Sequence, residues 1–124
     1  MGYTHYYTQK RSFTDSEWHN IRQAADQILR PAKYFIDHHN SSDQKLKITK
    51  DIILFNGIGD DAHETFLLDK KLRPTKWKGA TFNEGDCFRF TKTARKPYDK
   101  YVTALLIVIH NFANGALDIA SDGF

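Results

Sequence analysis

The sequence predicts an α+β fold in which a mainly antiparallel sheet of about four to five strands carries two principal helices packed on it. One segment repeats apolar residues at steps of three and four, as an amphipathic helix does, and a second is apolar around most of a helix circumference. Several short stretches rich in β-branched and aromatic residues are typical of strands. The chain has 124 residues, 40% of them hydrophobic and 27% charged, which is the size and balance of one globular domain. We therefore expect residues 1–124 to form a single α+β domain.

The first strand is predicted over Tyr3 to Thr8, where tyrosine and threonine dominate. Side chains alternate across a strand, so Tyr3, His5 and Tyr7 are expected on one face. That face could stack a nucleotide base, because aromatic rings pack well on bases. Packing within the core is the alternative role for the same three side chains.

The first helix is predicted to begin near Asp15. Thr14 and Glu17 have the spacing of a capping box, and Phe13 is placed to form a hydrophobic staple with the first turns. Pro31 is expected to kink or divide the helix, because proline cannot donate a backbone hydrogen bond. The apolar stripe comprises Trp18, Ile21, Ala25, Ile28, Ala32 and Phe35.

The middle of the chain reads as strands and loops. Residues 46–49 and 52–55 predict one long or broken strand. The turn residues of 56–61 then predict a hairpin with a long loop, whose second strand is 62–68. The basic stretch 70–78 is expected to be a loop, because it contains a proline and is followed by a glycine.

The last third predicts a strand at Cys87 to Thr91, a second helix from Pro97 to Phe112 and a short closing strand at Leu117 to Ala120. Asn114-Gly115 is a typical helix stop. Apolar residues cover most of the second helix, so we expect it to be central, against another helix or a second copy of the chain, and we expect a homo-oligomer.

Composition limits the classes of protein. The longest apolar run is far shorter than a membrane-spanning helix, and the N-terminus lacks the pattern of a secretory signal, so we expect no membrane contact. The lone Cys87 cannot form an intrachain disulfide, which favours the reducing cytoplasm of a host cell. The net charge of +3 permits an anionic partner without requiring nucleic acid.

The strongest candidate site precedes the second helix, where Lys92, Arg95 and Lys96 concentrate positive charge. Cations are unfavourable at a helix N-terminus, which already carries partial positive charge. A bound phosphate would compensate, using free backbone N–H groups, the Thr93 hydroxyl and the Arg95 fork. The alternative is that Asp99 or another carboxylate neutralises the cluster.

Two further segments could carry chemistry. The loop around His63 holds three carboxylates and a titratable imidazole, but its spacing matches no metal-binding motif, so we expect no metal and no cofactor. Asx-turns are the alternative role of this loop. The 70–78 stretch joins five cations to Trp77, which resembles a single-stranded nucleic acid surface and equally an ordinary solvated loop.

Five segments together resemble a family of small proteins encoded by bacteriophages and prophages, whose members open with a GYTHYW-like string. The likeness runs nearly end to end, with Tyr7 where the family pattern has tryptophan and Thr91 where it has cysteine. The resemblance implies a phage accessory role, including counter-defence, and supplies no catalytic residues. The segments are Gly2 to Tyr6, Phe55 to Gly57, Asp61 to Phe66, Lys92 to Asp99 and Ser121 to Gly123.

Three functions follow as hypotheses. The first is a non-enzymatic phage protein that binds a phosphate-bearing nucleotide without turning it over, with Lys92, Arg95 and Lys96 on the phosphate. The second is an inhibitor that binds a host defence protein. The third is a small phosphodiester or nucleotide hydrolase in which His63 or His5 is the acid or base and Arg95 stabilises developing charge.

Overall fold

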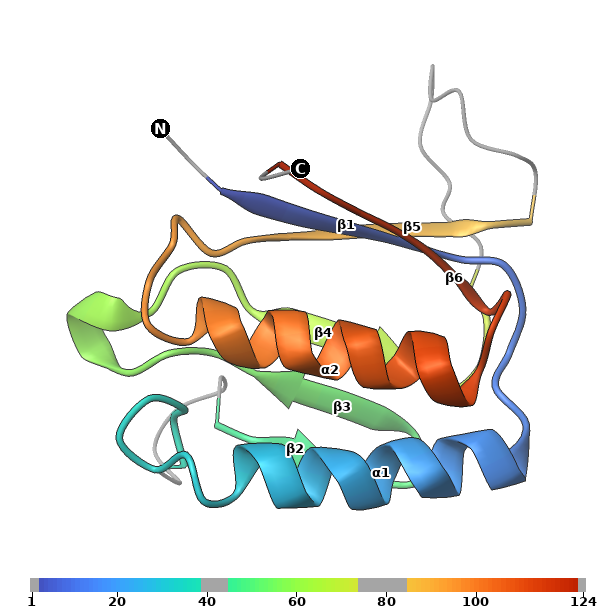
Figure 1. Ribbon diagram of the computed structural model, residues 1–124, viewed down its shortest axis with the longest axis horizontal. Helices are drawn as coiled ribbons and strands as arrows, with labels where there is room; N and C mark the ends of the chain where they lie inside the picture. Colours follow the sequence, from blue (N-terminus) through green and yellow to red (C-terminus); the bar gives the residue numbers. More distant parts are fainter. Residues whose placement is uncertain (1–2, 39–44, 74–84, 123–124) are drawn as a thin grey trace.

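The computed structural model describes residues 3–38, 45–73 and 85–122. Within them the chain forms two α-helices and six strands, which confirms the α+β class (Figure 1). The elements follow in the order β1 (Thr4–Gln9), α1 (Asp15–Leu29), β2 (Lys47–Ile48), β3 (Ile52–Phe55), the short 3-10 helix η1 (Gly59–Asp61), β4 (Phe66–Asp69), β5 (Cys87–Lys92), α2 (Asp99–Phe112) and β6 (Leu117–Ser121).

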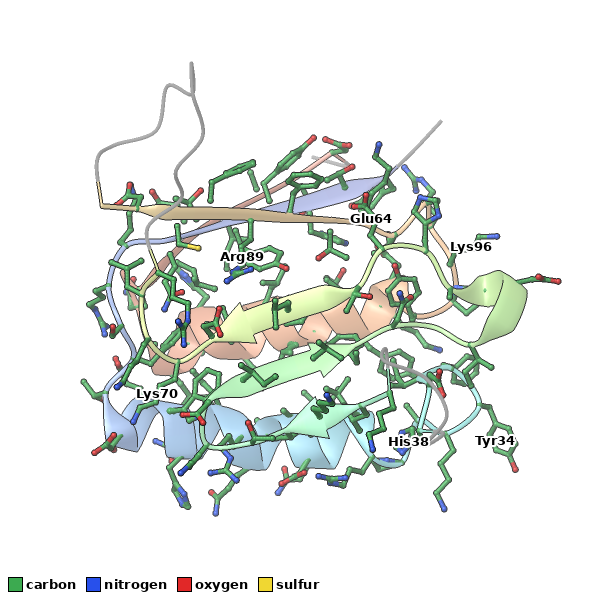
Figure 2. All side chains as sticks on the ribbon, turned by 180° about the vertical axis from the view of Figure 1, so that it is seen from behind. Tyr34, His38, Glu64, Lys70, Arg89 and Lys96 are labelled. Carbon is green, nitrogen blue, oxygen red and sulfur yellow. The ribbon has the colours of Figure 1, made fainter. Side chains whose placement is uncertain are left out.

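The strands form two antiparallel sheets rather than the single sheet of four to five strands that we expected. One sheet has the order β5-β1-β6 and the other β2-β3-β4. Along β4 the two sheets are joined by side-chain hydrogen bonds instead of backbone strand pairing. The Tyr7 hydroxyl donates to the Leu67 carbonyl at 3.2 Å, and the Gln9 amide donates to the Asp69 carbonyl at 3.2 Å. Arg89 of β5 also reaches the Asp69 carboxylate (Figure 2).

Helix α2 lies between the β5-β1-β6 sheet and α1, with β3 and β4 beside it (Figure 1). This confirms that the second helix is central. Val102, Leu105, Leu106 and Ile109 are buried on it. Ile107 remains 57% exposed, so the apolar surface of α2 is not fully covered within one chain.

Helix α1 begins as predicted. The Glu17 N–H donates to the Thr14 hydroxyl, the Thr14 N–H donates to the Glu17 carboxylate, and Phe13 packs on Trp18 with ring centroids 5.5 Å apart. The helix ends at Leu29, before Pro31, so Ala32 and Phe35 of the predicted stripe lie beyond it, although Ala32 is still buried in the core. The buried residues of the helix are Trp18, Ile21, Ala25 and Leu29, while Ile28 is partly buried and Phe35 is 37% exposed.

The start of α1 gives a pH-dependent prediction. The Arg11 guanidinium donates to both Glu17 carboxylate oxygens, at 2.8 and 2.9 Å, and lowers the pKa of Glu17 from 4.5 to about 2. Because the folded pKa is depressed, this contribution to stability is present above pH 4.5 and is lost as the pH falls through about 2. We expect Glu17→Gln to lower the unfolding free energy by about 1 kcal/mol at neutral pH. Urea unfolding should show that the difference in unfolding free energy between wild type and Glu17→Gln vanishes as the pH approaches about 2. A difference that does not change with pH would contradict the ion pair of Glu17 with Arg11.

The segment predicted as one long or broken strand is instead a hairpin. Strands β2 and β3 pair antiparallel, with Lys47 opposite Leu54 and Ile48 opposite Ile53. The Thr49 hydroxyl accepts hydrogen bonds from the backbone N–H groups of Asp51 and Ile52. These bonds stabilise the turn between the two strands. The sequence signal for this turn is a threonine followed by polar residues, which is weaker than a glycine turn.

The later elements match the prediction with shifted ends. The hairpin of β3 and β4 has the expected long loop, and β5 and β6 lie where strands were predicted. Helix α2 begins at Asp99 rather than Pro97, because the Lys96 and Asp99 N–H groups donate within tight turns before the helix. Of the basic stretch 70–78, residues 74–78 lie outside the described residues. Among the described segments, no helix is long and apolar enough to cross a membrane.

Candidate functional site

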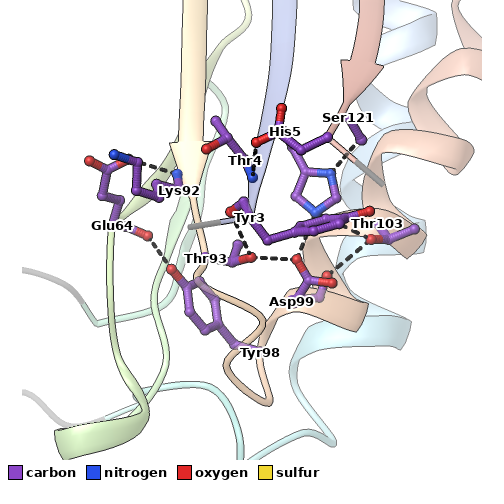
Figure 3. Close-up of polar contacts among 11 residues, drawn as sticks. Tyr3, Thr4, His5, Glu64, Lys92, Thr93, Tyr98, Asp99, Thr103 and Ser121 are labelled. Atoms are coloured by element: carbon purple, nitrogen blue, oxygen red, sulfur yellow. Dashed lines mark hydrogen bonds and ion pairs between the residues drawn. The ribbon is translucent and has the colours of Figure 1, made fainter. Parts of the chain in front are cut away.

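His5 is the centre of a polar cluster in which three distant segments meet (Figure 3). Its side chain lies on the buried face of β1, and the residue is only 1% exposed. The Nε2 atom lies 2.7 Å from Asp99 Oδ1 at the start of α2, and Nδ1 lies 2.6 Å from Ser121 Oγ at the end of β6. The backbone ladder between β1 and β6 places Ser121 directly opposite His5. The imidazole therefore bridges a carboxylate and a hydroxyl.

The hydrogen-bond partners determine which nitrogen of the neutral His5 ring carries the proton. An ionised Asp99 carboxylate can only accept, so Nε2 is the N–H donor. Nδ1 is then an acceptor, and the Ser121 hydroxyl donates to it. Asp99 Oδ1 also accepts from the Thr93 hydroxyl at 2.5 Å, and Thr103 Oγ1 donates to the Asp99 carbonyl at 3.2 Å. The Thr93 contact holds the carboxylate in place against the ring, whereas the Thr103 bond goes to the backbone of Asp99.

A pocket of about 230 Å³ opens beside this cluster, between α2 and β6. His5, Ser121 and Thr103 give the pocket a polar end, and the next turns of α2 supply apolar side chains. Small-molecule sites commonly combine an apolar wall with a few convergent polar groups. The lining residues are His5, Thr103, Leu106, Ile107, His110, Ile119 and Ser121.

The cationic residues that the sequence singled out lie in the turn between β5 and α2, which we call the basic loop (residues 92–96). Lys92 and Arg95 are exposed and Lys96 is half-buried. The Arg95 guanidinium carbon lies 4.5 Å from the centroid of the Tyr3 ring, a cation–π contact. In the described ranges, none of the three charged side-chain groups has a carboxylate oxygen within 4.0 Å. The Glu64 carboxylate does lie at the start of the loop, where it accepts from the Lys92 backbone N–H at 2.6 Å. The side-chain charges of Arg95 and Lys96 therefore remain available to an anion.

The backbone around the basic loop is not arranged as the sequence suggested. The Thr93 N–H donates to the Tyr3 carbonyl at 2.8 Å, and the Lys96 N–H donates to the Thr93 carbonyl at 3.0 Å. The Thr93 residue is fully buried, and its hydroxyl donates to Asp99. The N–H groups of Thr93 and Lys96 are therefore occupied, and an anion here would meet the side chains of Arg95 and Lys96.

Tyr3 connects the basic loop to the pocket. Its ring packs edge to face on the His5 imidazole, with centroids 5.1 Å apart, and carries the Arg95 guanidinium on its face. Arg95, Tyr3 and His5 thus lie in successive contact, ending at the polar end of the pocket. The fold thus places these three predicted site residues side by side, with Arg95 exposed, Tyr3 half-buried and His5 buried.

Tyr7 and His63 lie elsewhere. Tyr7 is 1% exposed, its ring packs on Phe66 with centroids 5.0 Å apart, and its hydroxyl lies 2.9 Å from Thr91 Oγ1. Burial raises the pKa of Tyr7 to about 12. His63 is exposed in the long loop after η1, where its backbone is held by the Asn56 side chain, and it does not line the pocket. Neither side chain is placed to contact a ligand of His5.

Sequence reasoning missed the partners of His5. The sequence suggests Asp99 only as a neutraliser of the basic loop, and it does not single out Ser121, Thr103 or His110 as site residues. The Asp99 to Thr103 spacing of one helical turn was a usable signal, because such residues share a helix face. The pairing of Ser121 with His5 depends on strands 116 positions apart, which no local pattern reveals.

Searches of family models, curated proteins and solved structures find no match to this chain. Within the described ranges, no group of three or more His, Cys, Asp or Glu side chains is arranged to hold a metal ion.

Proposed function

We propose that this protein binds a phosphate-bearing nucleotide at the surface formed by the basic loop, Tyr3 and the polar end of the pocket. The observation that carries the proposal is the position of Arg95. Its guanidinium lies on the Tyr3 ring and has no carboxylate partner among the described residues. The same Tyr3 ring contacts His5, which lines the pocket.

Arginine suits this role because its planar guanidinium donates two parallel hydrogen bonds to phosphate oxygens. Stacking on Tyr3 orients that plane before a ligand arrives, which lowers the entropy lost on binding. Lys96, one residue further along the loop, would add a second cation to the phosphate. The base or sugar would then lie against Tyr3 and the mouth of the pocket at His5.

The resemblance to phage-encoded proteins supports a biological setting for this binding. We propose a counter-defence role in which the protein holds a nucleotide signal of the host cell. The basic loop and the opening Tyr3 to Tyr6 segment both belong to the segments that carry the resemblance.

Charge reversal at Arg95 tests the proposal. We expect Arg95→Glu to weaken nucleotide binding at least about 100-fold, because it removes a charge-assisted bidentate contact and adds repulsion. Isothermal titration with a panel of mononucleotides, dinucleotides and cyclic nucleotides would measure the loss.

Lys50→Glu is the matched control, because Lys50 is an exposed cation in the turn between β2 and β3. It should bind as the wild type does, and both variants should melt within a few degrees of it. Affinity retained by Arg95→Glu would refute the proposed site, as would equal losses in the two variants.

A further inference from the structure

We propose that Ser121 is a catalytic nucleophile activated by His5, and that the protein cleaves a carboxylic ester whose small apolar acyl group lies in the pocket. Asp99 acts as the positioning residue for His5. The inference rests on the proposed function for one feature only: the leaving group is the phosphate-bearing part of the ligand, held at Arg95.

The hydrogen-bond geometry gives Ser121 the surroundings of an activated nucleophile. Its Oγ lies 2.6 Å from His5 Nδ1, and the opposite ring nitrogen lies 2.7 Å from the Asp99 carboxylate. A nucleophile bonded to a base, which is itself oriented by a third group, is the general arrangement of nucleophilic hydrolases. Here the serine contacts Nδ1 and the carboxylate contacts Nε2, the reverse of the usual assignment of the two nitrogens.

The Asp99 carboxylate is well fixed for this positioning role. It receives hydrogen bonds from Nε2 of His5 and from the Thr93 hydroxyl. A negative charge beside Nε2 favours the neutral ring with the proton on that nitrogen, and it stabilises the imidazolium that forms when Nδ1 gains a proton. The carboxylate thus selects the tautomer with the proton on Nε2, rather than the neutral form over the charged one, and this tautomer leaves Nδ1 as the acceptor of the Ser121 proton.

The pocket determines which group Ser121 could attack. Ser121 is half-buried and lines the pocket together with His5, whereas Leu106, Ile107 and Ile119 form the apolar wall beyond them. An acyl chain of a few carbons would bury its apolar surface against that wall and place its carbonyl at the serine. Among the described residues, no lysine or arginine lines the pocket to hold a second phosphate there.

The reaction would proceed in two balanced steps. Ser121 Oγ attacks the carbonyl carbon while its proton passes to His5 Nδ1; the carbon–oxygen bond to the leaving group then breaks, and that oxygen takes the proton from His5. Water next attacks the acyl-serine ester, losing its proton to His5. The serine oxygen leaves and recovers this proton, which releases the carboxylic acid.

An active-site label tests the nucleophile directly. We expect a small alkyl fluorophosphonate to add one adduct to the folded wild-type protein, with peptide fragmentation placing it on Ser121. Ser16→Ala is the matched control, because Ser16 is an exposed serine on α1, and it should label as the wild type does. Ser121→Ala should gain no adduct, and His5→Gln should label at least about 100-fold more slowly. Absence of an adduct on the wild type, or an adduct on another residue, would overturn the proposal. Because this result comes from the wild-type protein, it holds even if a variant misfolds.

Turnover separates a positioning role for Asp99 from a structural one. With p-nitrophenyl butyrate as substrate, we expect Asp99→Asn to lower kcat at least about 100-fold with little change in KM, while its circular dichroism spectrum stays that of the wild type. An unchanged kcat would refute the role. Nucleotide binding is measured separately on the wild type. Binding without labelling would overturn the catalytic proposal alone. Labelling without binding would overturn the proposed function and the leaving group taken from it, while Ser121 would stand as the nucleophile.

Discussion

Replacing Phe66 with alanine is expected to lower the unfolding free energy by about 3–5 kcal/mol. Phe66 lies on β4 and is completely buried, with its ring 5.0 Å from that of Tyr7 on β1 and 5.1 Å from that of Phe55 on β3. It therefore joins the two sheets, whose connection elsewhere along β4 depends on side chains rather than a ladder. Its removal leaves a cavity at that connection, and the close-packed surroundings cannot fully collapse into it.

Chemical denaturation by urea measures this effect, with Tyr34→Ala as the control. Tyr34 is also aromatic but is 89% exposed, so its loss should change stability by no more than about 0.5 kcal/mol (Figure 2). A Phe66→Ala protein as stable as Tyr34→Ala would show that the two sheets do not depend on this contact.

Replacing Asn56 with alanine is expected to lower the unfolding free energy by about 2–4 kcal/mol. Asn56 is fully buried at the end of β3, and its side chain organises the long loop before β4. Its amide donates to the His63 carbonyl at 3.0 Å and to Thr65 Oγ1 at 3.1 Å. Its side-chain oxygen, Oδ1, accepts from the Gly57 N–H at 2.7 Å and from the His63 N–H at 3.1 Å. The variant leaves several of these buried groups without partners, which costs more than the hydrogen bonds contribute.

Asn111→Ala provides the matched comparison, because Asn111 is exposed near the end of α2. Alanine is the better helix former, so this variant should be as stable as the wild type or slightly more so. Equal stabilities for the Asn56 and Asn111 variants would show that the loop does not need the buried amide.

Local sequence patterns predicted helices and strands well where the pattern corresponds to a specific interaction or geometry. The Thr14 and Glu17 capping box fixed the start of α1, and alternation along β1 correctly placed His5 and Tyr7 on one face. That face turned out to be the buried one, because the strand is the middle strand of its sheet and lies over α2. Periodicity cannot tell a buried face from one that binds a ligand, which is why Tyr7 was a candidate for base stacking.

The sheet division and the cluster around His5 could not be predicted in the same way. Both depend on contacts between segments far apart in the sequence, such as Glu64 with Lys92 and His5 with Ser121. A one-sheet prediction follows naturally from strand patterns, because these patterns do not specify partners. The basic loop shows the same limit: its cations were evident, whereas the hydrogen bonds that occupy its backbone N–H groups became visible only with the fold.

Native mass spectrometry tests the binding of a nucleotide most directly. The protein, purified from the cells that express it and then incubated with the nucleotide panel, is weighed under native and denaturing conditions. We expect an excess native mass equal to one phosphate-bearing nucleotide per chain, lost in Arg95→Glu and kept in Lys50→Glu. A wild-type chain that carries no excess mass with any nucleotide, or an Arg95→Glu chain that carries the same excess, would contradict it.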